Sequence, residues 1–208
     1  VNDVSIHLIW IYLLLRRRKM MGPIKIYSCG TYHPWRYRGE RNPRSGDRLS
    51  KAMMDLKDAS NSGYAKAVNI FTQLLTSSLQ SYVIGRVAFT DVPFEITIVP
   101  SHAEGKVSQA LIKIAQDIAK KFPNAVYNQS LQRKTTVVSA HKGGGDRSVE
   151  HHMSTIGVTS NVADKVILLI DDVTTTGGSM TACYYLLRYA GAKTILPLAL
   201  LETANYEE

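Results

Sequence analysis

The most informative hydrophobic pattern in the chain lies at residues 166–170, where five apolar residues stand together without alternation. Such a run predicts a strand that is buried on both faces, as strands of a parallel sheet are. Two carboxylates, Asp171 and Asp172, follow at once and lead into a loop rich in hydroxyl groups and glycine. Apolar residues from Met180 onward recur at helical spacing, and Gly191 is a natural end for that helix. The pattern therefore predicts a strand, a polar loop and a helix in that order.

The hydrophobic pattern of the rest of the chain predicts an α/β domain around this unit. Helices are expected over residues 49–56, 68–79 and 107–122, and strands over residues 94–100, 125–127 and 194–201. Because strands and helices alternate from Phe94 onward, the sheet is expected to be mostly parallel, Rossmann-like and flanked by helices on both faces. Ligands of such sheets bind at the carboxyl ends of the strands, where the loops at 101–106 and 171–179 both begin.

The loop after Asp172 has the composition of a phosphate-binding site. Backbone N–H groups, hydroxyls and a helix N-terminus surround one point, and glycine lets the backbone come close to an anion. The residues concerned are Thr174, Thr175, Thr176, Gly177, Gly178 and Ser179. Two acids beside this site would repel a bare phosphate, so the ligand must also offer hydroxyls or a divalent cation. A ribose 5-phosphate satisfies both requirements.

Two other interpretations of this stretch explain less of it. A buried strand followed by a helix cap accounts for Ser179 but not for two adjacent acids. The acid-tipped strand of a phosphoacceptor receiver domain gives no use to the loop that follows. A sugar phosphate site explains both parts.

The stretch Asp171–Ser179 closely resembles the phosphoribosyl pyrophosphate (PRPP) signature of type I phosphoribosyltransferases. Within that superfamily the chain looks most like the ComF (amidophosphoribosyltransferase-like) group. The segments that carry this second resemblance are Arg36–Glu40, Ile98–Pro100, Gln109–Ala110, Leu131–Arg133 and Leu200–Thr203. The chain departs from the group around residues 147–156, where Glu150, His151 and His152 stand, and in the glycine triplet at 143–145.

The resemblance implies an enzyme that transfers the 5-phosphoribosyl group from PRPP to an unidentified nitrogen nucleophile, a base or an amine, with release of pyrophosphate. It also implies a homodimer and a dependence on Mg²⁺, held by Asp171 and Asp172 through water. The two acids would stabilise the positive charge that develops on the ribose.

Other site residues are implied by position in the family. The loop after the predicted strand at 94–100 would bind pyrophosphate through Ser101, His102, Gly105 and Lys106. A long loop over residues 131–152 would close on the leaving group, with Arg133, Lys134 and Arg147 as its catalytic cations. The neighbouring His151 and His152 are not expected to share a metal ion, because no carboxylate or cysteine stands at a suitable spacing.

Charge leaves a second class of function open. The net charge of +8 favours anionic partners. The small, hood-like N-terminal segment at residues 22–48 mixes aromatic residues with arginines, so it either stacks nucleic acid bases or covers an edge of the sheet with solvated arginines. The alternative to the enzyme is a non-catalytic PRPP- or nucleotide-binding regulator, or a competence-type accessory protein for DNA uptake.

The start of the chain is expected to lie outside the fold. An apolar run at 6–15 precedes four basic residues and is too short to span a bilayer. We interpret residues 1–19 as a leader upstream of a true start at Met20 or Met21, and a weak membrane-surface anchor as the competing explanation. Residues 20–208 are then a single phosphoribosyltransferase-like domain. With two cysteines in unrelated contexts, a cytoplasmic location is expected.

Overall fold

The computed structural model of the chain describes residues 22–138 and 146–206. The expected leader, the two candidate start methionines and the glycine triplet lie outside these residues.

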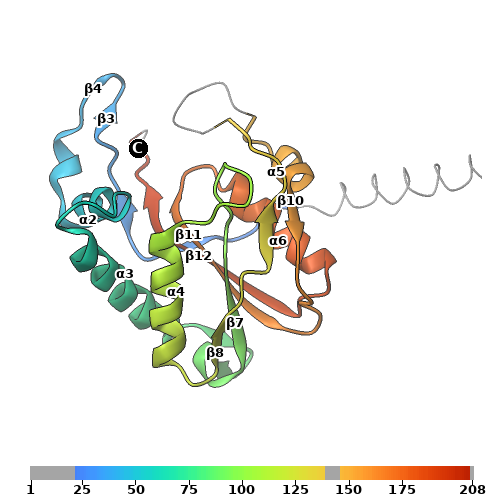
Figure 1. Cartoon of the computed structure of the whole chain (residues 1–208). Coiled ribbons are helices and arrows are strands. Elements are labelled where there is room, and N and C mark those ends of the chain that lie inside the picture. Colours follow the sequence, from blue (N-terminus) through green and yellow to red (C-terminus); the bar gives the residue numbers. More distant parts are fainter. Residues whose placement is uncertain (1–21, 139–145, 207–208) are drawn as a thin grey trace, which may run out of the picture.

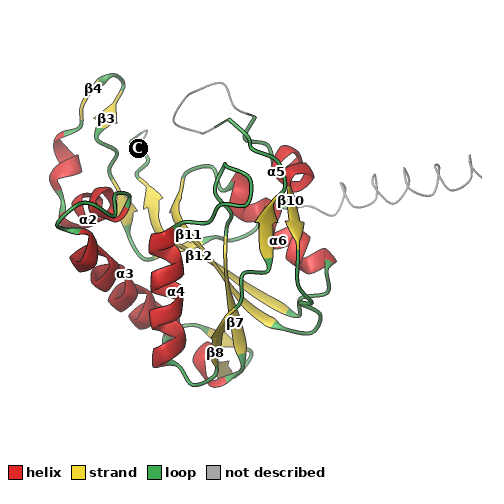
Figure 2. Cartoon of the chain, viewed as in Figure 1, coloured by secondary structure: helices red, strands yellow, loops and turns green. Residues whose placement is uncertain are grey.

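The central sheet is parallel throughout, with the strand order β1-β12-β11-β7-β8 and with β2 also paired to β12 (Figure 1, Figure 2). Its strands are β1 (Tyr27–Ser28), β2 (Thr31–Tyr32), β7 (Phe94–Ile98), β8 (Ala125–Tyr127), β11 (Val166–Thr174) and β12 (Thr194–Thr203). Two-stranded antiparallel pairs are formed by β3 (Arg36–Tyr37) with β4 (Glu40–Arg41), and by β5 (Val83–Ile84) with β6 (Val87–Ala88). The predicted fold class, a mostly parallel sheet flanked by helices, is confirmed.

Helices cover both faces of the sheet (Figure 1). The first face carries α2 (Arg48–Leu56), α3 (Tyr64–Leu79) and α4 (Gln109–Lys121), and the second carries α6 (Gly178–Tyr189). Helix α5 (Val149–Thr155) packs against α6. Short 3₁₀ turns lie at Pro43–Gly46 and Phe89–Asp91. Each predicted helix is present, with α6 ending just before Gly191, which adopts a φ of 95°. No helix in the described part of the chain is both long and apolar enough to span a bilayer.

Strand β11 separates the two hydrophobic cores. Leu168 and Ile170 pack with α2, α3 and α4, whereas Ile167 and Leu169 pack with α6. All four side chains have no exposed surface, as the unbroken apolar run predicted. The strand continues through the two acids to Thr174, farther than the apolar run itself, because β12 pairs with it up to Glu202.

The expected long loop at 131–152 is partly regular, which corrects the sequence analysis. Strand β9 (Leu131–Arg133) pairs antiparallel with β10 (Ile156–Val158), and α5 precedes β10. Leu131 and Ile156 are 1% and 2% exposed and anchor this pair in the second core. The loop prediction was wrong here because three-residue strands that pair across more than 20 residues leave no local periodicity.

The N-terminal segment forms the edge of the sheet through β1 and β2, and the β3–β4 hairpin extends beyond it (Figure 1). Of the two interpretations, covering the edge is therefore confirmed for residues 27–32. The segment is fixed to the other end of the chain by Tyr206, whose hydroxyl lies 2.6 Å from Asn42 Nδ2 and 2.7 Å from His33 Nδ1. The ring of Tyr206 also packs on that of Tyr37, with centroids 4.5 Å apart.

We predict that Leu168→Ala lowers the free energy of unfolding by about 2–5 kcal/mol, because it opens a cavity in a fully buried strand. Urea denaturation followed by circular dichroism measures this change. Val126→Ala on β8, where the side chain is 59% exposed, is the control and should change stability by less than about 0.5 kcal/mol. Equal effects of the two substitutions would contradict the assigned burial of β11.

Candidate active site

A cavity of about 310 Å³ lies at the carboxyl ends of β7 and β11. This is where the sheet topology was expected to place a ligand. The predicted site residues that line it are Ser101, His102, Arg133, Arg147, Asp171, Asp172, Thr174, Thr175, Thr176, Gly177, Gly178 and Ser179. The fold thus brings three separate chain segments to one cavity.

Two glycines shape the loop between β11 and α6. Gly177 has a φ of 74°, a left-handed conformation that glycine adopts without strain, and a side chain there would collide with Ile26. A side chain at Gly178 would collide with the backbone carbonyl of Arg147. Gly177 is the N-cap residue of α6 and has no side chain. The backbone N–H groups in the first turn of α6 therefore receive no hydrogen bond from a capping side chain. They are available to an anion in the cavity.

The acid pair is held in place by the backbone. The amide of Asp172 donates to Asp171 Oδ1 over 2.9 Å, and the amide of Val173 donates to Asp172 Oδ1 over 2.7 Å. Burial and the neighbouring charge of Asp172 raise the pKa of the Asp171 carboxyl well above its ordinary value. The positive charge of Lys57, at the end of α2, lowers the pKa of Asp171 and so partly opposes this shift. Sequence reasoning did not find Lys57, which carries no motif.

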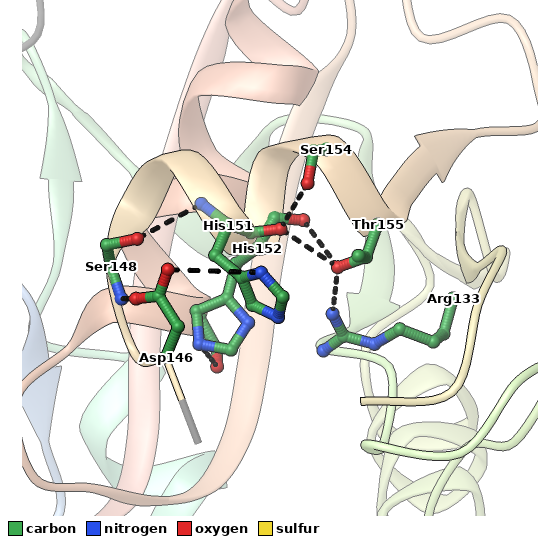
Figure 3. A network of polar contacts seen from close by, with 8 residues as sticks. Arg133, Asp146, Ser148, His151, His152, Ser154 and Thr155 are labelled. Carbon is green, nitrogen blue, oxygen red and sulfur yellow. Dashed lines mark hydrogen bonds and ion pairs between the residues drawn. The ribbon is translucent and has the colours of Figure 1, made fainter. Parts of the chain in front are cut away.

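Arg133 is the most deeply buried cation of the site, with 2% of its surface exposed. Its Nε donates to the carbonyl of Ser101 over 3.0 Å, and its Nη1 donates to Thr155 Oγ1 over 2.7 Å (Figure 3). Burial lowers the pKa of its guanidinium, which nevertheless stays charged. Both of these acceptors are neutral, so the cavity is lined by a cation that an anionic ligand would stabilise.

His152 is a cavity residue that sequence reasoning did not select. Its Nε2 lies 3.1 Å from Ser179 Oγ, which links α5 to the first turn of α6. Burial, and then the charges of Arg133 and His151, lower its pKa to about 4. The only available sign was its place in the segment where the chain departs from the ComF pattern.

Three predicted residues do not line the cavity. Gly105, with a φ of 64°, donates its N–H to the carbonyl of Arg133, and Lys106 accepts from the amide of Ser101 through its own carbonyl. The Lys106 side chain is exposed, and the side chain of Lys134 lies against Gly157 of β10. In the structure Gly105 and Lys106 take part in the turn after Ser101, and Lys134 packs against β10.

The acid pair fits a divalent cation held largely by water. No cluster of three or more metal-ligating side chains occurs within residues 22–138 and 146–206. Mg²⁺ needs only one or two carboxylates when phosphate and water complete its shell. The like charges of Asp171 and Asp172, which raise the pKa of Asp171, are the kind of repulsion that a bound cation relieves.

The sequence of the chain matches the profile of a known protein family. The profile of the phosphoribosyl transferase domain matches residues 108–206, which include α4, the acid pair and the loop at the start of α6. This part, slightly less than half of the chain, is therefore similar to a phosphoribosyl transferase domain. No curated protein has a sequence that matches the chain.

Solved structures whose backbones follow a similar path share little sequence identity with the chain. A phosphoribosylpyrophosphate synthetase from Mycobacterium smegmatis shares 17% identity over 64% of this chain and 33% of its own, with a TM-score of 0.39. A purine phosphoribosyltransferase from Pyrococcus horikoshii shares 16% identity over 68% and 89%, with a TM-score of 0.37. The chain thus spans about a third of the synthetase. At these TM-scores the likeness adds nothing to the fold described above.

We predict that Asp171→Asn stabilises the protein at pH 7. Because the folded pKa of Asp171 lies above its unfolded value near 3.8, the stability that this group contributes is lost as the pH rises through the folded pKa. Asparagine has no such loss. Urea denaturation should show the variant to be more stable at pH 7, with the difference shrinking as the pH falls toward 4.

Asp117→Asn on α4 is the control, because the pKa of Asp117 is shifted in the opposite direction and the change in stability should have the opposite sign. The hydrogen bond and charge of Lys113 lower the pKa of Asp117, so this variant should be slightly less stable than wild type at pH 7 and should converge with it at low pH. A variant at Asp171 that is no more stable than wild type at pH 7 contradicts the assigned electrostatics.

Proposed function

We propose that the protein is a Mg²⁺-dependent phosphoribosyltransferase, which transfers the 5-phosphoribosyl group of PRPP to a nitrogen nucleophile and releases pyrophosphate. The observation that supports this most directly is the composition of the cavity. Its lining combines the N-terminus of α6, with Thr175, Thr176 and Ser179, the buried cation of Arg133 and the acid pair. PRPP carries a phosphate at one end, a pyrophosphate at the other and a ribose diol between them.

Each end of the substrate has a matching partner in the proposal. The 5-phosphate accepts hydrogen bonds from the first turn of α6 and from Ser179, so that its binding energy orients the sugar. The pyrophosphate lies toward Ser101 and Arg133, whose charge stabilises the departing group. Arg147 is a further cation of the cavity lining.

Asp171 and Asp172 act on the ribose between these ends. As the bond from the anomeric carbon to pyrophosphate breaks, positive charge develops on the ring, and nearby carboxylates stabilise it. The same two residues would hold Mg²⁺, whose charge neutralises the pyrophosphate. A bound cation would also offset the repulsion from Asp172, which together with burial raises the pKa of Asp171 in the free protein.

We predict that calorimetric titration with PRPP gives binding that depends on Mg²⁺. The double substitution Asp171→Asn and Asp172→Asn should abolish that binding, and should lower pyrophosphate release with a competent nucleophile by about 100-fold or more. Asp117→Asn, remote on α4, is the control and should leave binding unchanged. Full activity in the double variant would refute the assignment.

The alternative, a nucleic-acid-binding role, is favoured by one feature of the surface. Trp35 is 45% exposed at the base of the β3–β4 hairpin, which also carries Arg36, Arg38 and Arg41. The guanidinium of Arg41 lies 4.6 Å from the centre of the Trp35 ring, so one aromatic face is already covered. This contact argues for a solvated hairpin and leaves the enzyme as the preferred proposal.

We predict for this alternative that DNA affinity falls with salt and that replacing Arg36, Arg38 and Arg41 by alanine lowers the slope of log affinity against log salt by about 2–3. Fluorescence anisotropy with a labelled oligonucleotide measures the slope. The triple substitution Lys113→Ala, Lys120→Ala and Lys121→Ala on α4, which also removes three positive charges, is the control. Binding that does not respond to salt removes the alternative.

A further inference from the structure

Helix α5 packs directly against the loop at the start of α6. The carbonyl of Arg147 faces Gly178 so closely that a side chain at 178 would collide with it, and His152 approaches the same position. At this contact, His152 Nε2 and Ser179 Oγ lie 3.1 Å apart. The proposed phosphate site therefore has a wall supplied by a different segment of the chain, and His152 in that wall is not among the residues taken over from the family resemblance.

We propose that His152 is a positioning residue for the phosphate site: its Nε2–H donates to Ser179 Oγ and leaves the Ser179 hydroxyl proton free to bind a phosphate monoester. The inference rests on the proposed function, because it assumes that such a group binds at the N-terminus of α6. It goes further by assigning a residue and a direction of hydrogen bonding to that site.

The direction follows from the surroundings of the other ring nitrogen. His152 Nδ1 is buried and has no hydrogen-bond partner within the described residues. The ring is neutral near pH 7, because burial together with the charges of Arg133 and His151 outweighs the opposing carboxylate of Asp146. A neutral ring carries one proton. Buried N–H groups are seldom left without an acceptor, so that proton belongs on Nε2.

The consequence for Ser179 is a fixed hydroxyl orientation. An Oγ that accepts from His152 directs its own proton elsewhere, and both residues line the same cavity. Without the histidine the hydroxyl would rotate freely, and some of its binding energy would be lost in fixing it.

The test compares His152→Leu, which removes the donor, with His152→Gln, whose side-chain amide places an N–H near the position of Nε2. Calorimetric titration with ribose 5-phosphate and with PRPP should show affinity about threefold to tenfold lower in the leucine variant, close to the loss of one hydrogen bond. The glutamine variant should recover most of it. His151→Leu, on the neighbouring residue, is the matched control and should bind as wild type does.

Ser179→Ala separates a positioning role from a merely structural one. If His152 acts through Ser179, the double variant Ser179→Ala with His152→Leu should bind as weakly as Ser179→Ala alone. Imidazole ¹⁵N spectra of the free protein at pH 7 should show the Nε2–H tautomer. Independent, multiplying losses in the double variant, or equal losses in the leucine and glutamine variants, would overturn the proposal.

The outcomes also separate this inference from the proposed function. Wild-type protein that binds neither ribose 5-phosphate nor PRPP overturns both. Wild-type protein that binds them, together with a leucine variant of unchanged affinity, overturns the role of His152 alone.

Discussion

The site depends on the parallel pairing of β11 with β7 on one side and β12 on the other. This ladder is buried on both faces by Ile167, Leu168, Leu169 and Ile170, so its position cannot drift without unpacking two cores. The acids and the phosphate loop are continuations of the same strand. Their placement relative to the loop after β7 therefore depends on the apolar packing of this strand.

Electrostatics work against the stability that this packing provides. Two adjacent carboxylates and the buried guanidinium of Arg133 meet around a single cavity, and the burial of each charge costs free energy. Burial and the charge of Asp172 both raise the pKa of Asp171, so the charged form of this residue is unfavourable in the free protein. Binding sites commonly carry such unfavourable groups because the ligand compensates them.

Much of this arrangement could be predicted from sequence, because it depends on local patterns. The apolar run before Asp171, the glycines before Met180 and the helical spacing in α4 each encode an element or its end. What could not be predicted arises from contacts between distant segments. The pairing of Leu131 with Val158, the hydrogen bond from Arg133 to Thr155 and the approach of His152 to Ser179 leave no periodicity in the chain.

The pairing of β1 with β12 has a consequence for the order in which the protein can assemble. Tyr27 lies opposite Leu198, and the hairpin that follows β2 is held by Tyr206. During synthesis on the ribosome, the first strands emerge long before their partner exists. Strands β1 and β2 therefore have no partner strand until β12 has been made, and until then their backbone groups are hydrogen-bonded to water. Closure of this edge is a late, long-range event, and loop-closure entropy makes such events slow.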